Sequence, residues 1–425
     1  MEELDKGAMN CDLTRNVQTP LAKGGSKPTT FLRYWGSYLK SLRHAGVIAA
    51  DFRPLVKRGW RCFLVLERPP EDLTWLKEFN DLGVTIFYAP RPRGQFDLGC
   101  IRRIATLVRR TGTVVFHCDN MHTSPLIGAA LGGAKVRIWS KLDMDPAFKA
   151  CRPPSLKEQL GVSNRISCWL CHRVIAVSTA VRDEMVARGI PEEKFIVRNS
   201  PRIYAPPEQT MTPQAIRKGW GCSANEVVVL TLGRCIPVKA WDILLLAFAP
   251  VVKAAPEARL ILVGSYATPA EKPFYALLQG LLQEHQIADK VIFTGFVAEV
   301  WATLKAADVF VLPSLSEGAS FALIEGLDAG LPCVATGVGN AREVIRDGEN
   351  GFIVPRCDPA ALSRALAQLV QDQDLRRRFA ANVKAPDHIP DMHESAEQFA
   401  LDYEALLQNK PVPVFADPRL ISGRR

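Results

Sequence analysis

The 425-residue chain lacks any apolar stretch long enough to cross a membrane as a helix. Its longest apolar run lies near residues 243–252 and is interrupted by Pro250, whereas a membrane-spanning helix needs about 20 consecutive apolar residues. The beginning of the chain carries Glu2, Glu3 and Asp5 and lacks the basic-then-apolar pattern of a secretory signal. We therefore expect a protein that works in the cytoplasm.

The chain also lacks a disulfide framework and a zinc-site spacing. Its eleven cysteines are an odd number and are scattered, as expected in a reducing compartment. Cys168, Cys171 and His172 match the pattern of c-type haem attachment, but this chemistry requires an exported chain. We expect these residues to lie in an amphipathic helix, with the cysteines buried as structural residues. No second Cys/His pair follows at the spacing of a zinc site.

Positive charge is concentrated in the first half of the chain. Residues 1–200 hold 31 Lys and Arg against 19 Asp and Glu, and the remainder holds 22 against 25. No nucleic-acid-binding motif accompanies this surplus, so we expect contact with a membrane surface or a phosphate-linked acceptor rather than with nucleic acid. Four arginines gather on one predicted helix near residues 101–108 with no acidic residue among them: Arg102, Arg103, Arg109 and Arg110.

Predicted strands and helices alternate along the chain in two series, which favours two parallel α/β sheets. Strands of the first series are predicted at residues 29–34, 62–66, 83–88, 113–117, 136–139 and 173–177, and those of the second at 226–232, 259–263, 291–293, 308–312 and 351–354. We divide the chain into a tail (1–28), a first domain (29–200), a linker (201–224), a second domain (225–385), a helix that returns to the first domain (390–410) and a second tail (411–425).

The most distinctive stretch is a run of small and apolar residues between Glu317 and Glu325. A predicted buried strand ends at Pro313 just before it, and Gly330 and another predicted strand follow it. A strand, a glycine-bearing turn and a helix N-terminus present free backbone N–H groups and the positive end of a helix dipole. The stretch therefore predicts an anion site, and its flanking carboxylates suit the hydroxyl groups of a sugar.

This order of residues resembles the nucleotide-sugar site of retaining glycosyltransferases with the GT-B fold, family 4 in particular. The shared pattern is a Glu-Gly turn, a helix with a second Glu eight residues later, and a Gly-x-Pro strand at 330–332. The resemblance covers most of residues 100–410 and is strongest at 226–355. It implies an α/β fold of two Rossmann-like domains whose parallel sheets face each other across a cleft, with donor in the second domain and acceptor in the first.

A second motif of the same family follows the first strand of the second domain. Gly233, Arg234 and Lys239 match it, and Ala240 stands where the family usually has glycine. A guanidinium group grips phosphate oxygens bidentately, and an ammonium group adds a point charge. Departure of a nucleoside diphosphate leaves negative charge on the distal phosphate, so charges aimed there stabilise the transition state. The resemblance implies that these groups and a helix N-terminus replace a metal, so we expect no metal and no cofactor.

The resemblance also assigns roles to single residues. Glu325 would accept hydrogen bonds from the ribose of the nucleotide, and Glu317 would hold hydroxyl groups of the donated sugar. We name Glu317, Arg234 and Lys239 as candidate catalytic residues. The backbone N–H groups of residues 319–322 would face the sugar and its phosphates. The candidate donor-binding residues are therefore Gly233, Gly318, Ala319, Ser320, Phe321, Ala322 and Glu325.

The first domain departs further from the family pattern. Gly46 represents the family's glycine pair, and the predicted helix around it is short, with Pro54 inside it. Lys141 stands where many members have a histidine, and His117 ends the preceding predicted strand. We name Gly46, His117 and Lys141 as candidate acceptor-side residues. For His117, a structural role is the alternative.

The expected activity is transfer of a sugar, with retention, from a nucleoside-diphosphate sugar to a glycan or lipid-linked acceptor, as in cell-surface polysaccharide synthesis. The expected place is the cytoplasm, with the anionic inner face of the plasma membrane as a peripheral docking surface. The alternatives are a non-catalytic nucleotide-sugar-binding protein of the GT-B fold, a sugar-nucleotide epimerase, and a synthase with a soluble acceptor.

Overall fold

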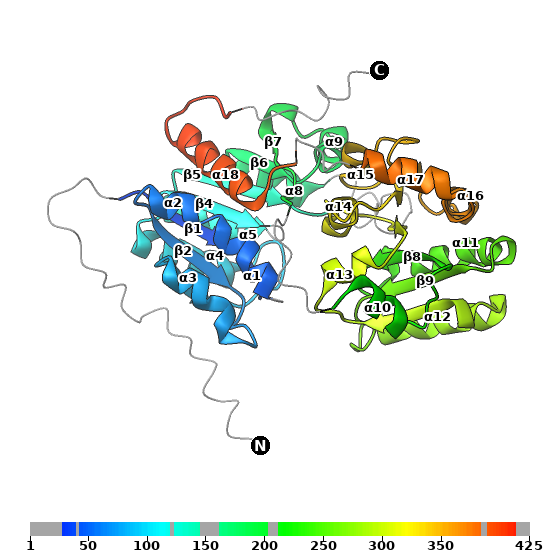
Figure 1. Ribbon diagram of the computed structural model, residues 1–425. Coiled ribbons are helices and arrows are strands. Elements are labelled where there is room, and N and C mark those ends of the chain that lie inside the picture. Colours follow the sequence, from blue (N-terminus) through cyan, green and yellow to red (C-terminus); the bar gives the residue numbers. More distant parts are fainter. Residues whose placement is uncertain are drawn as a thin grey trace.

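The computed structural model describes residues 28–39, 42–119, 123–144, 161–202, 211–383 and 389–413. Most of the predicted tails, at 1–28 and 411–425, and residues 203–210 of the predicted linker lie outside these described residues. The described residues form two α/β units, each built on a parallel sheet (Figure 1). None of the helices in these ranges has the length and apolar content that crossing a bilayer requires.

The first sheet contains seven strands within the described residues, in the order β3-β2-β1-β4-β5-β6-β7, and all of the pairings are parallel. Its strands are β1 (Thr30–Tyr34), β2 (Arg61–Leu66), β3 (Thr85–Tyr88), β4 (Val115–Asp119), β5 (Val136–Lys141), β6 (Arg173–Ala176) and β7 (Phe195–Val197). Its helices are α1 (Leu42–Ala50), α2 (Arg53–Lys57), α3 (Lys77–Asp81), α4 (Leu98–Thr111), α5 (Thr123–Gly132), α8 (Val162–Leu170) and α9 (Thr179–Ala187). Short 3₁₀ turns lie at Leu73–Leu76 and Glu192–Lys194.

The second sheet contains six strands in the described part of the chain, in the order β10-β9-β8-β11-β12-β13, again parallel throughout. Its strands are β8 (Val227–Leu232), β9 (Ala258–Val263), β10 (Val291–Gly295), β11 (Val309–Leu312), β12 (Cys333–Thr336) and β13 (Gly351–Val354). Its helices are α10 (Pro213–Gly219), α11 (Trp241–Ala254), α12 (Lys272–His285), α13 (Val300–Lys305), α14 (Phe321–Asp328), α15 (Ala341–Val344), α16 (Pro359–Gln371) and α17 (Gln373–Asn382). Short 3₁₀ turns lie at Pro237–Lys239 and Ala288–Lys290.

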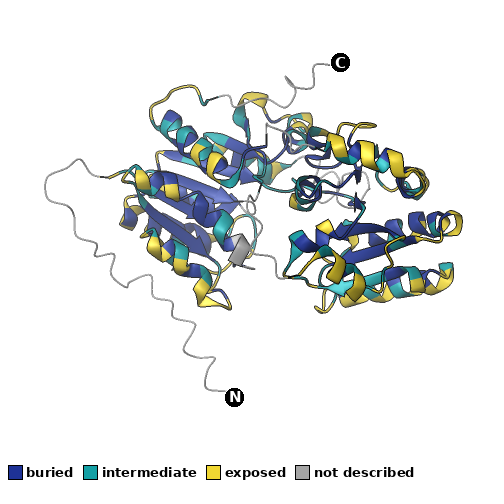
Figure 2. Cartoon of the chain, viewed as in Figure 1, coloured by how far each residue is buried: buried dark blue, intermediate teal, exposed yellow. Residues whose placement is uncertain are grey.

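Apolar, β-branched runs form the central strands because both faces of each sheet are covered by helices. All six residues of β8 are buried, and so are all five of β1. Figure 2 shows the strands of both sheets buried and the exposed residues gathered on the outer faces of the helices. The two cores place the carboxyl ends of the strands of each sheet along one edge, which is where α/β proteins bind ligands.

A last helix, α18 (Met392–Leu407), follows the second unit in sequence but packs on the first, against α1 and α2 (Figure 1). Its Tyr403 is buried and stacks on Phe31 of β1, with ring centroids 5.1 Å apart. Its Asp402 accepts two hydrogen bonds from Arg198, which follows β7. The helix α18 is therefore part of the first core although it follows the second unit in sequence.

Two local expectations were wrong. Pro54 does not interrupt one short helix, because the chain forms two helices there and Pro54 lies in the first turn of α2, where proline's missing N–H costs nothing. Of the Cys168–His172 segment, the helix α8 includes residues only as far as Leu170. The thiols of Cys168 and Cys171 are buried, and burial raises the pKa of each to about 12. Such thiols are structural, as the sequence indicated.

Candidate functional site

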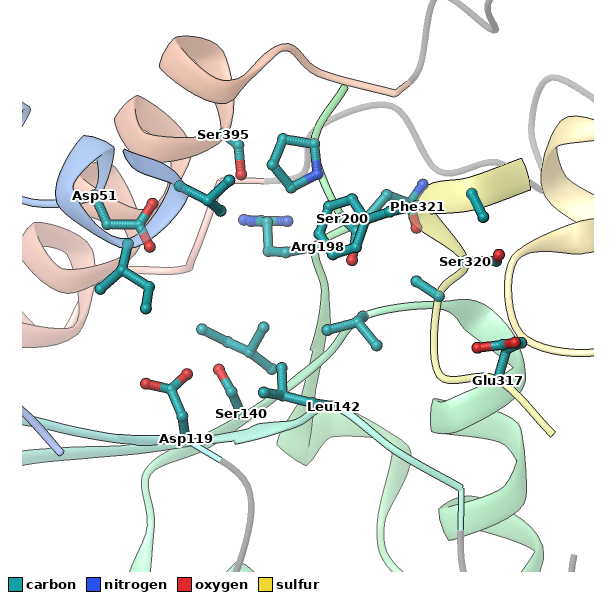
Figure 3. Close-up of a pocket in the computed structure, with 18 of the residues that line it drawn as sticks. Asp51, Asp119, Ser140, Leu142, Arg198, Ser200, Glu317, Ser320, Phe321 and Ser395 are labelled. Atoms are coloured by element: carbon teal, nitrogen blue, oxygen red, sulfur yellow. The ribbon is translucent and has the colours of Figure 1, made fainter. Parts of the chain in front are cut away.

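A cavity of about 570 Å³ lies between the two units, at the carboxyl ends of β1, β4 and β5 on one side and of β8 on the other (Figure 3). This volume is within the usual range for small-molecule sites. All of the predicted catalytic and donor-binding residues except Gly318 line it. We call the part formed by the second unit the donor wall and the part formed by the first unit, Arg198–Pro201 and α18 the acceptor wall.

On the donor wall, Lys239 reaches across to the loop that follows β11. Its Nζ donates to Oε1 of Glu317 at 2.6 Å, and the hydroxyl of Ser314 donates to the same oxygen at 2.7 Å. Both charged side chains remain partly accessible from the cavity. The structure therefore brings together two of the three candidate catalytic residues although 78 positions separate them in the sequence.

Arg234 also lines the cavity, but its side chain is exposed. Within the described residues, its guanidinium makes no hydrogen bond or ion pair, so its donors remain available to a ligand. A few residues later, Ala240 has a left-handed backbone with a φ of 51°. This conformation explains why glycine is the usual residue of the family pattern at that position.

The N-terminus of α14 faces the cavity through Phe321 and Ala322. The hydroxyl of Ser320 caps the helix by accepting from the backbone N–H of Leu323 at 3.2 Å. The expectation that all N–H groups of residues 319–322 face the ligand was wrong for Ser320, whose N–H donates to Asn340 Oδ1 at 2.9 Å. Among the described residues, the N–H groups of Phe321 and Ala322 have no such partner, so these are the donors that an anion would meet.

Gly318 lies at a contact between the two units and not in the cavity lining. A Cβ at this position would fall 1.8 Å from the carbonyl oxygen of Leu142 in the first unit, so the backbones approach closely enough to require glycine. The hydroxyl of Ser178 donates to the carbonyl oxygen of Gly318 at 2.7 Å. Next to it, the N–H and hydroxyl of Thr179 donate to Glu343 at 2.7 and 2.6 Å. These contacts fix the loop that follows β11 against the first unit.

The acceptor wall contains a buried charge cluster that the sequence analysis missed. Arg33 of β1 donates to both carboxylate oxygens of Asp119, at 2.7 and 3.1 Å, and also to Asp51, which follows α1. All three side chains line the cavity and are largely buried. One signal was available in the sequence, because a charge inside an apolar strand such as that of Arg33 is costly unless it is paired.

A second arginine of the acceptor wall, Arg198, is held by α18. Its guanidinium donates to both oxygens of Asp402, at 2.9 and 2.6 Å, and to the carbonyl oxygen of Pro413 at 3.0 Å. Burial raises the pKa of Asp402 to about 6 in spite of this arginine. Ser395 and Phe399 of the same helix line the cavity as well. No spacing in the sequence indicated that residues of α18, near the end of the chain, would join Arg198 in this wall.

None of the three candidate acceptor-side residues, Gly46, His117 and Lys141, lines the cavity, although neighbours of each do. The ring of His117 is completely buried, with Nδ1 2.6 Å from the hydroxyl of Tyr403 and Nε2 2.6 Å from that of Ser140. Burial lowers the pKa of His117 to about 4, so its ring is neutral near pH 7. This geometry is that of a structural histidine, and the proposed acceptor contacts of the three residues stay predictions.

Lys141 is buried at the end of β5, between Ser140 and Leu142, which line the cavity. The described residues contain no group of three or more His, Cys, Asp or Glu side chains placed to hold a metal ion. The expectation of a reaction without metal or cofactor stays a prediction.

Comparison with known proteins shows what the second unit is similar to in sequence. Residues 213–385 match the family described as "Glycosyl transferases group 1". Over 276 residues the chain is 30% identical to D-inositol 3-phosphate glycosyltransferase of Streptomyces coelicolor, covering 60% of this chain and 58% of that protein. It is 27% identical to N-acetyl-alpha-D-glucosaminyl L-malate synthase of Bacillus anthracis, covering 43% and 45%. The chain thus spans about half the length of the curated relatives that it matches.

The fold extends over more of the chain than the sequence identity does. The crystal structure of Anabaena Alr3699/HepE in complex with UDP and glucose superimposes with a TM-score of 0.72 and 19% identity, covering 89% of this chain and 100% of that one. WaaG, a glycosyltransferase involved in lipopolysaccharide biosynthesis, superimposes with a TM-score of 0.64 and 16% identity, covering 87% and 98%. The chain therefore has the GT-B fold, which confirms the predicted fold class, and its second unit matches the group 1 glycosyltransferase model.

Proposed function

We propose that this protein is a retaining glycosyltransferase that moves a sugar from a nucleoside-diphosphate sugar to a glycan or lipid-linked acceptor. The observation that carries the proposal is the donor wall. There, the exposed guanidinium of Arg234, the Lys239–Glu317 ion pair and the N-terminus of α14 line one cavity. Support comes from the names of its relatives, several of which are glycosyltransferases, and from the UDP and UDP-glucose in complexes of a GT-B neighbour.

The proposed reaction breaks the bond between the anomeric carbon and the distal phosphate and forms a bond to an acceptor hydroxyl oxygen on the same face of the sugar. The hydroxyl proton leaves with the phosphate. Arg234 and Lys239 would stabilise the negative charge that develops on the departing diphosphate. Glu317 would hold the sugar hydroxyls and keep the ammonium of Lys239 in place, and Glu325 would accept from the ribose. Each of these side chains lines the cavity.

The proposal is tested by incubating the purified protein with UDP-, GDP-, ADP- and dTDP-sugars and measuring release of the nucleoside diphosphate. We expect slow release from one donor without an acceptor, and faster release with the right acceptor. NMR of the product should show the anomeric configuration of the donor. A product of inverted configuration would contradict retention, and no release from any donor would favour a non-catalytic binding protein. A C2-epimerised sugar would support the epimerase alternative.

We further propose that the protein docks on an anionic membrane through α4, which would give access to a lipid-linked acceptor. Arg102, Arg109 and Arg110 are exposed on this helix. Leu98 is 74% exposed at the beginning of the helix, and Phe96 is 53% exposed just before it. Clustered cations next to exposed apolar side chains suit a surface of acidic headgroups. A synthase with a soluble acceptor is the alternative, as in the relative named as a malate synthase.

A further inference from the structure

The acceptor wall differs from a phosphate site in how its positive charges are used. Arg33 lies between two carboxylates, with Asp119 gripping it through both oxygens and Asp51 contacting the other end of the guanidinium. The three side chains are between 1% and 8% exposed as residues. Figure 3 shows Asp51 and Asp119 on the side of the cavity opposite Glu317 and Ser320. The carboxylates therefore lie at the end of the cavity away from the donor wall.

The cluster contains one cation and two carboxylates. The nearby carboxylates raise the pKa of the Arg33 guanidinium, so it stays protonated. Burial raises the pKa of Asp51 in spite of the neighbouring Arg33. With both carboxylates ionised the cluster carries one net negative charge, and with Asp51 protonated it is neutral. In neither state is there a spare positive charge for an anionic ligand.

The guanidinium of the other arginine of this wall is also engaged by acceptors of the protein. Arg198 donates to both oxygens of Asp402 and to the carbonyl oxygens of Val197 and Pro413. Asp402 is fully buried behind it, so the pair is neutral and fixed. By contrast, the donor wall keeps the exposed guanidinium of Arg234 for a phosphate. The two walls are therefore suited to different ligand charges.

The rest of the acceptor wall is hydroxylated, apolar and aromatic. Its hydroxyl groups come from Ser140, Ser200 and Ser395, and its rings from Trp35 and Phe399. Carboxylates and hydroxyls accept and donate hydrogen bonds to the hydroxyl groups of a sugar, and aromatic or aliphatic side chains pack against its C–H faces. This composition is what an uncharged polyhydroxylated ring requires.

We propose that the acceptor wall selects an uncharged hydroxylated group, the terminal sugar or polyol of the acceptor, through Asp51 and Asp119, and rejects acceptors with a phosphate at that position. The inference rests on the proposed function and names the acceptor class. A phosphate placed against this cluster would meet like charge with no free cation of the acceptor wall among the described residues, which disfavours the wrong ligand by repulsion and desolvation. The relative named D-inositol 3-phosphate glycosyltransferase would thus differ from this protein in acceptor charge.

The first experiment uses the unchanged full chain and matched pairs of probes. These are myo-inositol and inositol 3-phosphate, glucose and glucose 6-phosphate, and N-acetylglucosamine and its 6-phosphate. Binding of each is measured by calorimetry or saturation-transfer NMR with the tightest-binding nucleoside diphosphate present at saturation. We expect the uncharged member to bind at least about tenfold more tightly in one or more pairs. Equal or tighter binding of the phosphorylated member in every pair, or no binding of any uncharged member, would overturn the inference.

The second experiment changes the charge of the cluster with little change in shape. Asp119→Asn and Asp51→Asn each remove one negative charge next to Arg33. In either folded variant, the affinity ratio should shift toward the phosphorylated probe by about tenfold. Asp81→Asn is the matched control, because Asp81 is an exposed surface residue paired with Lys77 in the same unit. An unchanged ratio in a variant with a normal circular dichroism spectrum would contradict the inference, and if both variants fail to fold, the unchanged chain decides.

The proposed function and the assignment of acceptor charge would be contradicted by different results. Binding of the nucleoside diphosphate, measured in the same titrations without acceptor probes, depends on the donor wall. Its absence would contradict the proposed function. Normal nucleotide binding together with a preference for phosphorylated probes would leave the proposed function intact and overturn the assignment of acceptor charge alone.

Discussion

The two walls of the cavity use their charged residues in opposite ways. On the donor wall, Arg234 is exposed and makes no hydrogen bond or ion pair among the described residues, and Lys239 has one carboxylate partner that remains accessible. On the acceptor wall, Arg33 and Arg198 are buried and each is gripped by both oxygens of a carboxylate. A charge that is to act on a departing phosphate must be accessible from the cavity in the resting protein. The arginines of the acceptor wall are already paired, so they hold its carboxylates in fixed orientations instead.

The basic surplus of the first half of the chain fits the same comparison. It lies partly on the outside of the first unit, on α4, and not in the cavity, where arginines and carboxylates are balanced. The sequence grouped four arginines on one polar face of α4. In the structure Arg103 is turned inward, with its Nε buried, so the exposed cluster contains Arg102, Arg109 and Arg110.

The largest effect is expected when a cationic side chain is removed from the donor wall. Arg234→Ala and Lys239→Ala should each lower kcat/KM at least about a hundredfold, because each removes a charge aimed at the departing phosphate. Steady-state rates of nucleoside diphosphate release measure this, with thermal melting as a test of folding. Lys253→Ala is the control, because Lys253 is an exposed cation of the same unit at the end of α11. Near-normal turnover in both cavity variants would contradict the phosphate assignment.

The next prediction concerns the outer surface of the first unit, where the exposed arginines of α4 are expected to bind membranes. Changing Arg102, Arg109 and Arg110 together to Gln should weaken binding to vesicles with anionic lipid about a hundredfold, at about 1 kcal/mol per residue. Binding of the unchanged protein should also fade as salt is added. Co-sedimentation at low salt is the measurement. A variant with Lys253, Lys272 and Arg364 changed to Gln loses the same charge elsewhere, and equal loss of binding in both would count against a role of α4.

A smaller effect distinguishes the two glutamates of the donor wall. Glu325→Ala should weaken binding of the free nucleoside diphosphate about tenfold, because it loses a charge-assisted hydrogen bond to the ribose. Glu317→Ala should leave that affinity nearly unchanged and slow the transfer step, since Glu317 contacts Lys239 and the sugar position. Isothermal calorimetry and turnover rates test both. The reverse pattern would mean that the two roles are exchanged.

The smallest effect concerns His117 on the acceptor side. Burial lowers its pKa from 6.5 to about 4, so between these values the unfolded chain binds a proton that the folded protein excludes. Stability is therefore lost as the pH falls below 6.5. Relative to His117→Gln, the unchanged protein should lose about 1 kcal/mol more of unfolding free energy between about pH 6.5 and 5.5. Urea unfolding at both pH values measures the difference, and identical pH dependence would contradict a buried neutral ring.

Sequence patterns indicated the residues of the donor wall because each of its two motifs, at 233–239 and at 317–325, is a short local segment. Glu317 to Glu325 is one strand–turn–helix segment, and Ser320 caps the helix as its residue type indicates. The departures arise from contacts made by distant residues. The N–H of Ser320 is taken by Asn340, and Gly318 is covered by the carbonyl of Leu142. Neither contact follows from local spacing.

The acceptor wall was predicted poorly because its residues come from separate parts of the chain. Arg33 and Asp119 are 86 positions apart, and Arg198 and Asp402 are 204 apart. Sequence analysis ended the fourth strand at His117, whereas β4 continues to Asp119, the residue at the carboxyl edge where ligands bind. The candidate acceptor-side residue taken from this strand was therefore the buried His117, two residues earlier. Only the fold shows which polar residue of a strand faces a cavity.

The contrast between the walls is tested most directly by titrating nucleoside diphosphates into three proteins by calorimetry. The proteins are the unchanged chain, Arg234→Ala and Asp119→Asn, and the ligands are UDP, GDP, ADP and dTDP. We predict that one nucleotide binds the unchanged chain, that Arg234→Ala weakens this binding at least about tenfold, and that Asp119→Asn leaves it unchanged. Full affinity in Arg234→Ala, or a greater loss in a folded Asp119→Asn protein, would contradict the assignment of donor and acceptor to the two walls.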